Sequence, residues 1–300
     1  MWRLGVVSFL NSRPLIAGLV DDPRVALTFD VPAALPGRLE RGEVDAALVP
    51  IIDVLRRADR WRIVSDAGIG CDGETMTVRV FSQVPPDRIE TLWADTDSHT
   101  SVALATVLWR ELFGREVELR RLDARSRRPD DVPAVLLIGD KVVDPGRGRF
   151  AYEVDLGGAW RQHTGLPFVF AVWAVQNGEL RIASSELGMA NSGLVKTESD
   201  SPNSLLGTRY SELAALLSAA RDRGVEAAAE IAERDGPRLG WPVELARRYL
   251  TQCLTFRLDR RHVAGAERFA QHCQALGLVP PGHVLPWPAG PSAAATESAR

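Results

Sequence analysis

The sequence has few cysteines, and they show no pattern of pairing. Cys71, Cys253 and Cys273 are the three cysteines among 300 residues, and none belongs to a Cys-x-x-Cys pair. An odd number of widely spaced cysteines is typical of free thiols in a reducing compartment. We therefore expect no disulfide framework.

Long apolar runs are also missing. No stretch of the sequence approaches the roughly 20 residues that a membrane-spanning helix needs. The apolar run after Arg3 is short and leads into Asn-Ser-Arg-Pro, which is not the small-residue cleavage site of a signal peptide. We expect a cytoplasmic protein without a membrane partner.

Signatures of metal and cofactor binding are absent from the sequence as well. The five histidines, His99, His163, His262, His272 and His283, are scattered without the spacing of a metal site. The sequence contains no Gly-x-Ser-x-Gly, no phosphate-binding glycine-rich loop and no dinucleotide fingerprint. We expect no metal and no cofactor, and we expect His262 and His272 to lie on the surface of a C-terminal helix.

Strong charge of either sign is the last missing feature. The net charge is -3, and the arginine-rich stretch 120–128 is followed at once by Asp130 and Asp131. This pattern predicts a solvated surface and no nucleic-acid partner. With 45% hydrophobic and 25% charged residues over 300 positions, the composition favours a globular protein of two domains.

The pattern that is present is an alternation of short apolar segments with amphipathic ones. This alternation predicts an α/β fold with mainly parallel sheets covered by helices. The expected strands are 4–9, 25–31, 44–49, 61–65, 76–81, 91–94, 117–122, 134–138 and 168–175. The expected helices are 15–19, 33–41, 51–58, 102–112, 156–163, 210–223, 225–234, 242–253 and 261–276.

Turn-forming residues suggest where one domain passes into the other. Residues 68–73 are predicted to be a break, and residues 82–87, which contain Pro85 and Pro86, a linker. We take the apolar segment 168–175 as the return crossing. The expected domains are therefore 1–82 plus 176–285 and 83–175, with a loop over 184–203 and a disordered tail over 286–300.

The first candidate site follows the first strand. Asn11 and Ser12 are residue types that cap helices, and Pro14 suits a first helical turn. In open α/β sheets, ligands bind beyond the carboxyl ends of the strands, where the Asn11 amide could both donate and accept a hydrogen bond. Plain helix capping explains Asn11 and Ser12 equally well.

A second candidate site lies between a strand and the helix 102–112. Ser98, Thr100 and Ser101 with free backbone N–H groups at a helix start would bind an anion such as a carboxylate, with His99 beside them. Helix capping is again the alternative.

Two more pairs of residues stand near the expected crossing and at the end of a buried strand. Thr75 and Thr77 would present two hydroxyls on one side of an extended segment. Gly139 and Asp140 end the apolar strand 134–138, where a carboxyl group could reach a cleft or merely cap a turn.

Several motifs follow one another along the chain. They are residues 9–15 (FLNSRPL), 45–50 (DAALVP), 100–104 (TSVAL), 137–140 (LIGD), 155–157 (DLG), and Trp160 with 164–173 (TGLPFVFAVW). Taken in this order, they resemble the chorismate dehydratase family of the futalosine route to menaquinone. The resemblance implies a fold like the type II periplasmic binding proteins, with a ligand held between two α/β lobes. The family often has Ser at the position of Thr77 and Arg at the position of His99.

The resemblance also implies a reaction and a substrate partner, chorismate. The family converts chorismate to 3-[(1-carboxyvinyl)oxy]benzoate and water without a cofactor or a metal. We expect Asn11 to be the catalytic residue, which holds the departing hydroxyl or the enolpyruvyl carboxylate while that carboxylate takes the adjacent ring proton. Ser12, Thr75, Thr77, Ser98, His99, Thr100, Ser101, Gly139 and Asp140 are the expected substrate-binding residues, and Asp140 and His99 are the alternative acid–base groups.

Three alternatives remain open. The sister enzyme of the same pathway makes a dihydroxynaphthoate from a larger substrate on the same fold, but residues 164–173 are more similar to the dehydratases. A solute-binding protein without catalysis would normally carry a signal peptide. A regulatory ligand-binding domain would be accompanied by a DNA-reading module. A homodimer is also left open.

Overall fold

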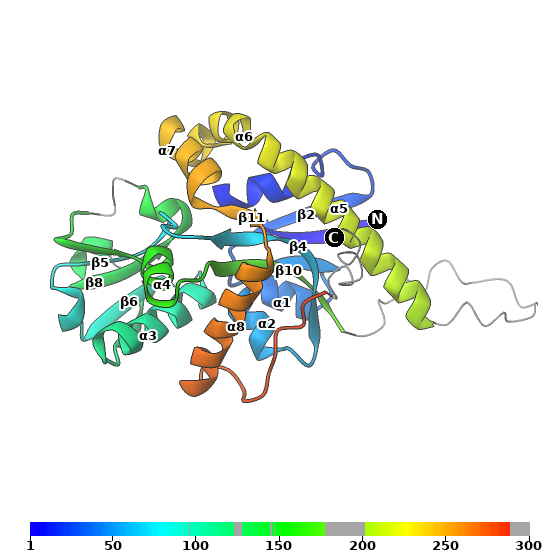
Figure 1. Cartoon of the computed structure of the whole chain (residues 1–300). Coiled ribbons are helices and arrows are strands. Elements are labelled where there is room, and N and C mark those ends of the chain that lie inside the picture. Colours follow the sequence, from blue (N-terminus) through cyan, green and yellow to red (C-terminus); the bar gives the residue numbers. More distant parts are fainter. Residues whose placement is uncertain (96, 123–127, 145, 147, 178–201, 289–300) are drawn as a thin grey trace, which may run out of the picture.

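A computed structural model describes residues 1–95, 97–122, 128–144, 146, 148–177 and 202–288 of the chain. These residues form two mixed β-sheets with helices packed on them, and Figure 1 shows the two sheets side by side. In the part of the chain that is described, no helix is long and apolar enough to cross a membrane.

The first sheet is built from both ends of the chain and has the strand order β11-β4-β10-β3-β1-β2. Strand β1 pairs in parallel with β2 and β3, whereas β10 runs antiparallel to β3 and β4. Every residue of β3 and all but the last of β10 are buried, as expected for central strands covered on both faces. The strands are β1 (Trp2–Val7), β2 (Val25–Asp30), β3 (Ala46–Pro50), β4 (Trp61–Cys71), β10 (Phe168–Gln176) and β11 (Thr255–Arg257).

The second sheet comes from one continuous stretch of the chain and has the order β7-β6-β8-β5-β9. The apolar strand β8 is central, as its sequence predicts, and the polar strand β7 lies at an edge. The strands are β5 (Val78–Ser82), β6 (Thr91–Asp95), β7 (Glu118–Leu122), β8 (Ala134–Ile138) and β9 (Tyr152–Asp155).

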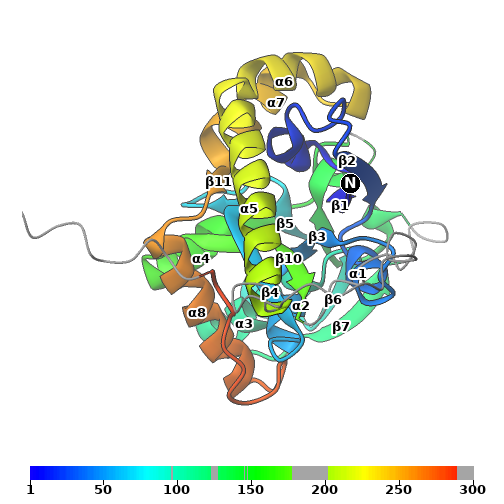
Figure 2. The ribbon, with the colours of Figure 1, turned by 90° about the vertical axis from the view of Figure 1, so that its right-hand side faces the viewer.

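Helices cover both faces of the first sheet. Helix α5 (Pro202–Glu226) packs on one face, and α1 (Leu35–Glu40), α2 (Ile51–Arg56) and α8 (Arg260–Ala275) pack on the other (Figures 1 and 2). Helices α3 (His99–Phe113) and α4 (Leu156–Thr164) pack on the second sheet.

The remaining helical segments are short. They are the α-helices α6 (Ala228–Asp235) and α7 (Val243–Arg248), the 3₁₀ helices η1 (Leu10–Ile16), η2 (Pro86–Arg88), η3 (Pro129–Asp131), η4 (Gly139–Val142) and η6 (Pro237–Leu239), and the π-helix η7 (Tyr249–Cys253).

The expected domain boundaries, at residues 82/83 and 175/176, place two strands in the wrong sheet. Strand β5 pairs with β8 and β9 in the second sheet, and β10 pairs with β3 and β4 in the first. The chain therefore crosses between the sheets over residues 72–77 and 156–167. The proline pair at 85–86 misled the prediction because it starts a turn within the second sheet rather than a linker.

The predicted break at 68–73 is wrong for its first part, because β4 continues through Cys71. Gly68 and Gly70 occupy places in this strand where no side chain fits. A Cβ atom on Gly68 would lie 2.7 Å from the carbonyl oxygen of Ala171, and one on Gly70 would lie 2.9 Å from that of Phe168. Glycine marks a close approach of two backbones here, not a turn.

Three further expectations are corrected. The sheets are mixed rather than mainly parallel, because β10 and β5 run antiparallel to their neighbours. The helix expected at 15–19 is replaced by the 3₁₀ helix η1, which begins five residues earlier, at Leu10. Strands β9 and β11 were not predicted, since both are short.

Two predicted segments fall mostly outside the description. Residues 184–201 of the expected loop lie outside the described residues, and Pro202 is the first residue of α5. Residues 289–300 of the expected disordered tail lie outside them too. Its first residue, Pro286, is held in place because its carbonyl oxygen accepts a hydrogen bond of 3.0 Å from the Ile63 N–H.

Candidate functional site

A pocket lies where the two sheets meet, with about 480 Å³ of space free of protein atoms. This space includes open solvent at the mouth of the pocket. Its walls come from both sheets, from the first crossing and from the C-terminal part of the chain. They consist of Val7, Phe9, Asn11, Pro32, Ile69, Thr75, Thr77, Val78, Ser98, Ser101, Ile138, Gly139, Phe170, Ala171, Tyr249 and Leu254.

The pocket brings together residues that the sequence analysis selected from four separate segments. They are Asn11, Thr75, Thr77, Ser98, Ser101 and Gly139. The other four selected residues, Ser12, His99, Thr100 and Asp140, are not among those that line it.

Three of these four side chains are engaged elsewhere. The buried Ser12 hydroxyl donates to the carbonyl oxygen of Val7 at 2.6 Å and does not cap η1, whose start has no side-chain cap. The Thr100 hydroxyl donates to the carbonyl oxygen of Phe170 at 3.2 Å. His99 Nδ1 lies 2.7 Å from the Asp53 carboxylate and faces a separate surface groove.

Asn11 reaches the pocket because η1 follows β1 directly. The Oδ1 atom of Asn11 is buried and has no hydrogen-bond partner among the described residues. A buried amide oxygen without a partner costs free energy, so it is suited to accept a hydrogen bond from a bound molecule.

Asp140 supports this wall from behind. Its carboxylate accepts hydrogen bonds from the Leu10 backbone N–H at 3.4 Å and from Trp241 Nε1 at 2.8 Å. Burial raises the pKa of Asp140, and the hydrogen bonds from Trp241 and Leu10 act in the opposite direction. Asp140 therefore holds the start of η1 in place and is not aimed at the pocket.

Gly139 joins η1 to the second sheet. Its φ of +59° lies in the left-handed region, and a Cβ atom here would lie 2.7 Å from the Phe9 ring. Its N–H donates to the carbonyl oxygen of Thr77 at 2.9 Å. Both the conformation and the close packing require glycine.

Thr75 and Thr77 lie in a tight turn of the first crossing that one aspartate holds. The Asp155 carboxylate accepts hydrogen bonds from the N–H groups of Thr75 (2.9 Å), Met76 (2.7 Å) and Gly158 (2.9 Å). Met76 has a φ of +65°, a strained conformation for a residue with a side chain. Because Asp155 also begins α4, it ties the first crossing to the second.

Gly157 and Gly158 of α4 offer a matched test of this packing. A Cβ atom on Gly157 would lie 2.6 Å from Cys71 Sγ and 3.0 Å from Thr75 Cβ, whereas one on Gly158 would meet nothing closer than 3.7 Å. We expect Gly157→Ala to lower the free energy of unfolding by about 1–3 kcal/mol. Gly158→Ala should raise it by up to about 1 kcal/mol, since alanine favours a helix.

Urea titration of both variants measures this difference. Equal stability of the two variants would contradict the idea that the close contact of Gly157 with the first crossing is rigid.

Ser98 and Ser101 form the helix start that the sequence predicts, although α3 begins at His99, three residues before the expected position. Ser98 Oγ accepts from the Ser101 N–H at 3.2 Å and lies 2.8 Å from Ser101 Oγ. The Ser98 hydroxyl therefore caps α3, and both serines line the pocket at the positive end of the helix dipole.

A half-buried group of three charged residues supports this helix start. Lys141 Nζ lies 2.8 Å from the nearer Asp95 carboxylate oxygen and 2.5 Å from Asp97. Burial raises the pKa of Asp95, and the Lys141 ammonium acts in the opposite direction. The carbonyl oxygen of Asp97 also accepts from the Ala33 N–H at 3.0 Å, which joins the two sheets at this wall.

Tyr249 is a pocket residue that the sequence analysis did not select. It lies in η7, is 1% exposed, and its hydroxyl is 2.6 Å from Thr77 Oγ1. Its ring stacks on Trp241 with centroids 4.9 Å apart. The signal that could have found it is its rarity, since the chain has three tyrosines and a buried one needs a hydrogen-bond partner.

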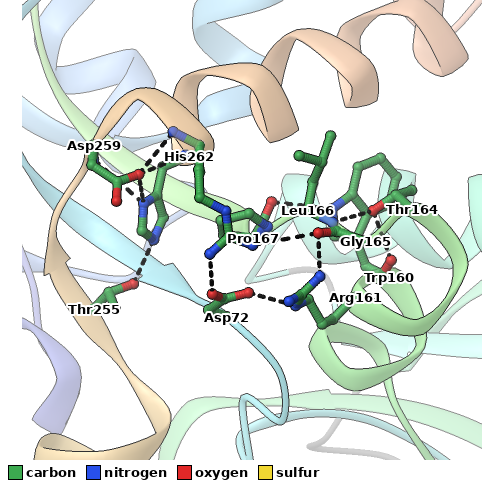
Figure 3. A network of polar contacts seen from close by, with 11 residues as sticks. Asp72, Trp160, Arg161, Thr164, Gly165, Leu166, Pro167, Thr255, Asp259 and His262 are labelled. Carbon is green, nitrogen blue, oxygen red and sulfur yellow. Dashed lines mark hydrogen bonds and ion pairs between the residues drawn. The ribbon is translucent and has the colours of Figure 1, made fainter.

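The start of α8 packs on the second crossing, as Figure 3 shows. Arg161 of α4 and Arg261 of α8 both form ion pairs with Asp72 of the first crossing. The side chain of Arg161 also donates to the carbonyl oxygen of Gly165. The C-terminal part of the chain thus joins both crossings.

His262 is buried rather than exposed, so its predicted surface position is wrong. Its ring nitrogens lie 2.7 Å from the Asp259 carboxylate and 2.8 Å from Thr255 Oγ1 (Figure 3). His272 is also largely covered, with 12% of its side chain exposed. His262 faces β11 and β4 of the first sheet, whereas His272 faces α3 and α4, where it contacts Glu111 and Trp160. Spacing along the helix did not reveal either position.

Within the described ranges, no group of three or more histidine, cysteine, aspartate or glutamate side chains could hold a metal ion.

The architecture is similar to solved periplasmic-binding-protein-like structures. Protein AF1704 from Archaeoglobus fulgidus matches 93% of this chain and 98% of its own at 15% identity, with a TM-score of 0.59. The alkanesulfonate-binding protein SsuA from Xanthomonas axonopodis pv. citri matches 93% of this chain and 94% of its own at 12% identity, with a TM-score of 0.59.

The Candida albicans CA3427 gene product, described as having the generic periplasmic binding protein fold, covers 92% of this chain and 90% of its own, with 13% identity and a TM-score of 0.57. These likenesses confirm the predicted fold class.

Similarity in sequence is more specific. A curated chorismate dehydratase from Thermus thermophilus is 28% identical over 264 residues, which are 83% of this chain and 85% of that protein. The family model described as menaquinone biosynthesis matches residues 2–275, a range that includes every residue of the pocket. The chain therefore belongs to the menaquinone biosynthesis family, as its motifs predict.

Proposed function

We propose that this protein is a chorismate dehydratase, which converts chorismate to 3-[(1-carboxyvinyl)oxy]benzoate and water. The observation that carries the proposal is the match to the chorismate dehydratase of Thermus thermophilus over 83% of this chain. The reaction would make the protein a carbon–oxygen hydro-lyase, and biosynthesis from chorismate suits a cytoplasmic enzyme.

The chemistry of the pocket supports this reaction. The described walls combine apolar side chains with neutral hydrogen-bonding groups from Asn11, Thr75, Thr77, Ser98 and Ser101. Chorismate carries two carboxylates. One of them would bind at the start of α3, where the free N–H groups and the two serine hydroxyls favour an anion.

The second carboxylate, on the enolpyruvyl group, would act as the base. It takes the ring proton from the carbon that carries the ether oxygen, while the neighbouring C–O bond breaks and its electron pair leaves with the hydroxyl oxygen. That hydroxide takes up the transferred proton, so water leaves and the ring becomes aromatic. Asn11 would hold the reacting groups in line, so positioning supplies most of the rate.

Each of the two sheets, with its helices, would form one lobe around the substrate. In the sequence, the strands of the second lobe would lie between the two crossings, 72–77 and 156–167. The strands of the first lobe would lie before the first crossing and after the second. Closure of the lobes would exclude water from the reacting atoms.

Incubation of the purified protein with chorismate tests the proposal. We expect a product that is lighter by one water and has an aromatic absorbance, detected by chromatography and mass spectrometry. Heat-inactivated protein is the control.

Unchanged chorismate would contradict the proposal. If chorismate then still raised the melting temperature, the result would favour a binding protein. If it did not, the larger-substrate sister enzyme would be the next candidate.

A further inference from the structure

Three polar side chains from distant parts of the chain meet at one edge of the pocket. Tyr249 comes from η7, Thr77 from the first crossing and Asn11 from η1, and all three line the pocket. The Tyr249 hydroxyl lies 2.6 Å from Thr77 Oγ1. The phenol is therefore placed to orient a hydroxyl group of the pocket.

The direction of this hydrogen bond follows from the chemistry of the two hydroxyls. Burial raises the pKa of the Tyr249 phenol, so it keeps its proton. A phenol is more acidic than an aliphatic alcohol and is the stronger donor, so Tyr249 donates to Thr77 Oγ1. The Thr77 hydroxyl can then direct its own proton into the pocket.

Tyr249 is itself held rigidly. Its ring is 1% exposed and stacks on Trp241 at an interplanar angle of 14°. Trp241 donates to Asp140, whose carboxylate also accepts from the Leu10 N–H beside Asn11. The C-terminal segment is thus joined to the first crossing through the phenol, and to the wall that carries Asn11 through Trp241 and Asp140.

We propose that Tyr249 is a positioning residue that donates a hydrogen bond to Thr77 Oγ1, so that Thr77 in turn donates to the departing hydroxyl oxygen of the substrate. This inference rests on the proposed function. In the reaction, Thr77 stabilises negative charge on the oxygen as the C–O bond breaks, and the enolpyruvyl carboxylate accepts the ring proton and passes it to that oxygen. Tyr249 and Thr77 keep their own protons throughout.

Kinetics of Tyr249→Phe, Thr77→Val and the double variant test the inference. The loss of a single donor to an oxyanion typically costs about 100- to 1,000-fold in kcat. We expect kcat to fall about 100-fold in Thr77→Val and about 10- to 100-fold in Tyr249→Phe, with KM changed by less than about 3-fold in each. Because both residues act through the same bond, the double variant should be about as slow as Thr77→Val alone.

Tyr210→Phe is the matched control. This variant also removes one tyrosine hydroxyl, which donates to the carbonyl oxygen of Gln176 at 3.2 Å and lies outside the pocket. Its kcat should stay within about 2-fold of the wild-type value. Melting temperatures of all variants show that each one is folded.

The outcomes distinguish this inference from the proposed function. A wild-type protein that does not turn over chorismate would refute the function and, with it, this role of Tyr249. A wild type that turns it over while Tyr249→Phe keeps an unchanged kcat, or fully additive losses in the double variant, would refute the inference alone. A loss that appears only in KM would refute it too, because the residue would then act in substrate binding.

Discussion

Replacement of Asn11 by alanine is expected to reduce turnover of chorismate by about 1,000-fold or more while the protein still folds. The Asn11 amide lines the pocket, and its buried Oδ1 has no partner in the described structure. In the proposed mechanism, loss of the amide removes the group that aligns the reacting atoms. Single-turnover assays with excess enzyme measure the effect on the chemical step directly.

Asn177→Ala is the control for this variant. The Asn177 side chain donates to the carbonyl oxygens of Asp59 and Trp61 and accepts from Arg62 Nε, all outside the pocket. Its loss should cost about 1 kcal/mol of stability and leave kcat near the wild-type value. An Asn11→Ala variant with a rate close to that of the wild type would show that another group performs the alignment.

Replacement of Asp155 by alanine is expected to lower the free energy of unfolding by about 3 kcal/mol or more. The side chain is 14% exposed, and its carboxylate accepts from three backbone N–H groups that would lose their partner. Burial raises the pKa of Asp155, and the hydrogen bonds from Gly158, Thr75 and Met76 act against that rise together with Arg79. Without the carboxylate, the strained Met76 conformation has no support, so turnover should fall as well.

Asp259→Ala is the matched comparison, because Asp259 also caps a helix. Its carboxylate accepts from the N–H groups of Arg261 and His262, but the side chain is 60% exposed. Loss of an exposed cap should cost about 1 kcal/mol. Urea unfolding of the two variants compares them, and equal losses would mean that Asp155 is an ordinary cap and does not support the crossing.

The sequence predicted most of the strands because their apolar runs are strong. The prediction failed where one residue type occurs in two kinds of structure. Gly68 was predicted to lie in a turn, but it permits two strands to approach each other. The prolines at 85 and 86 were predicted to form a linker, but they begin a turn within one sheet. The short strand β11 has no pattern of its own and exists because β4 offers it an unpaired edge.

For the site, the order of the motifs carried more information than periodicity. Asn11, Thr75 and Ser98 each had a capping or structural explanation that local sequence could not dismiss, and only the fold brings them to one pocket. Tyr249 escaped prediction because its role depends on a partner that is distant in the sequence, Thr77. His262 was misplaced for a similar reason, since its neighbours lie outside its own helix.

The order of the strands along the chain has a consequence for synthesis on the ribosome. All strands of the second sheet lie between Val78 and Asp155, whereas the first sheet needs strands from Trp2–Val7 to Thr255–Arg257. A growing chain can therefore complete its second sheet while the first still lacks an edge strand. Tyr249 emerges late, so a nascent chain carries Thr77 long before the residue that contacts its hydroxyl, and the pocket is complete only once the C-terminal part has been made.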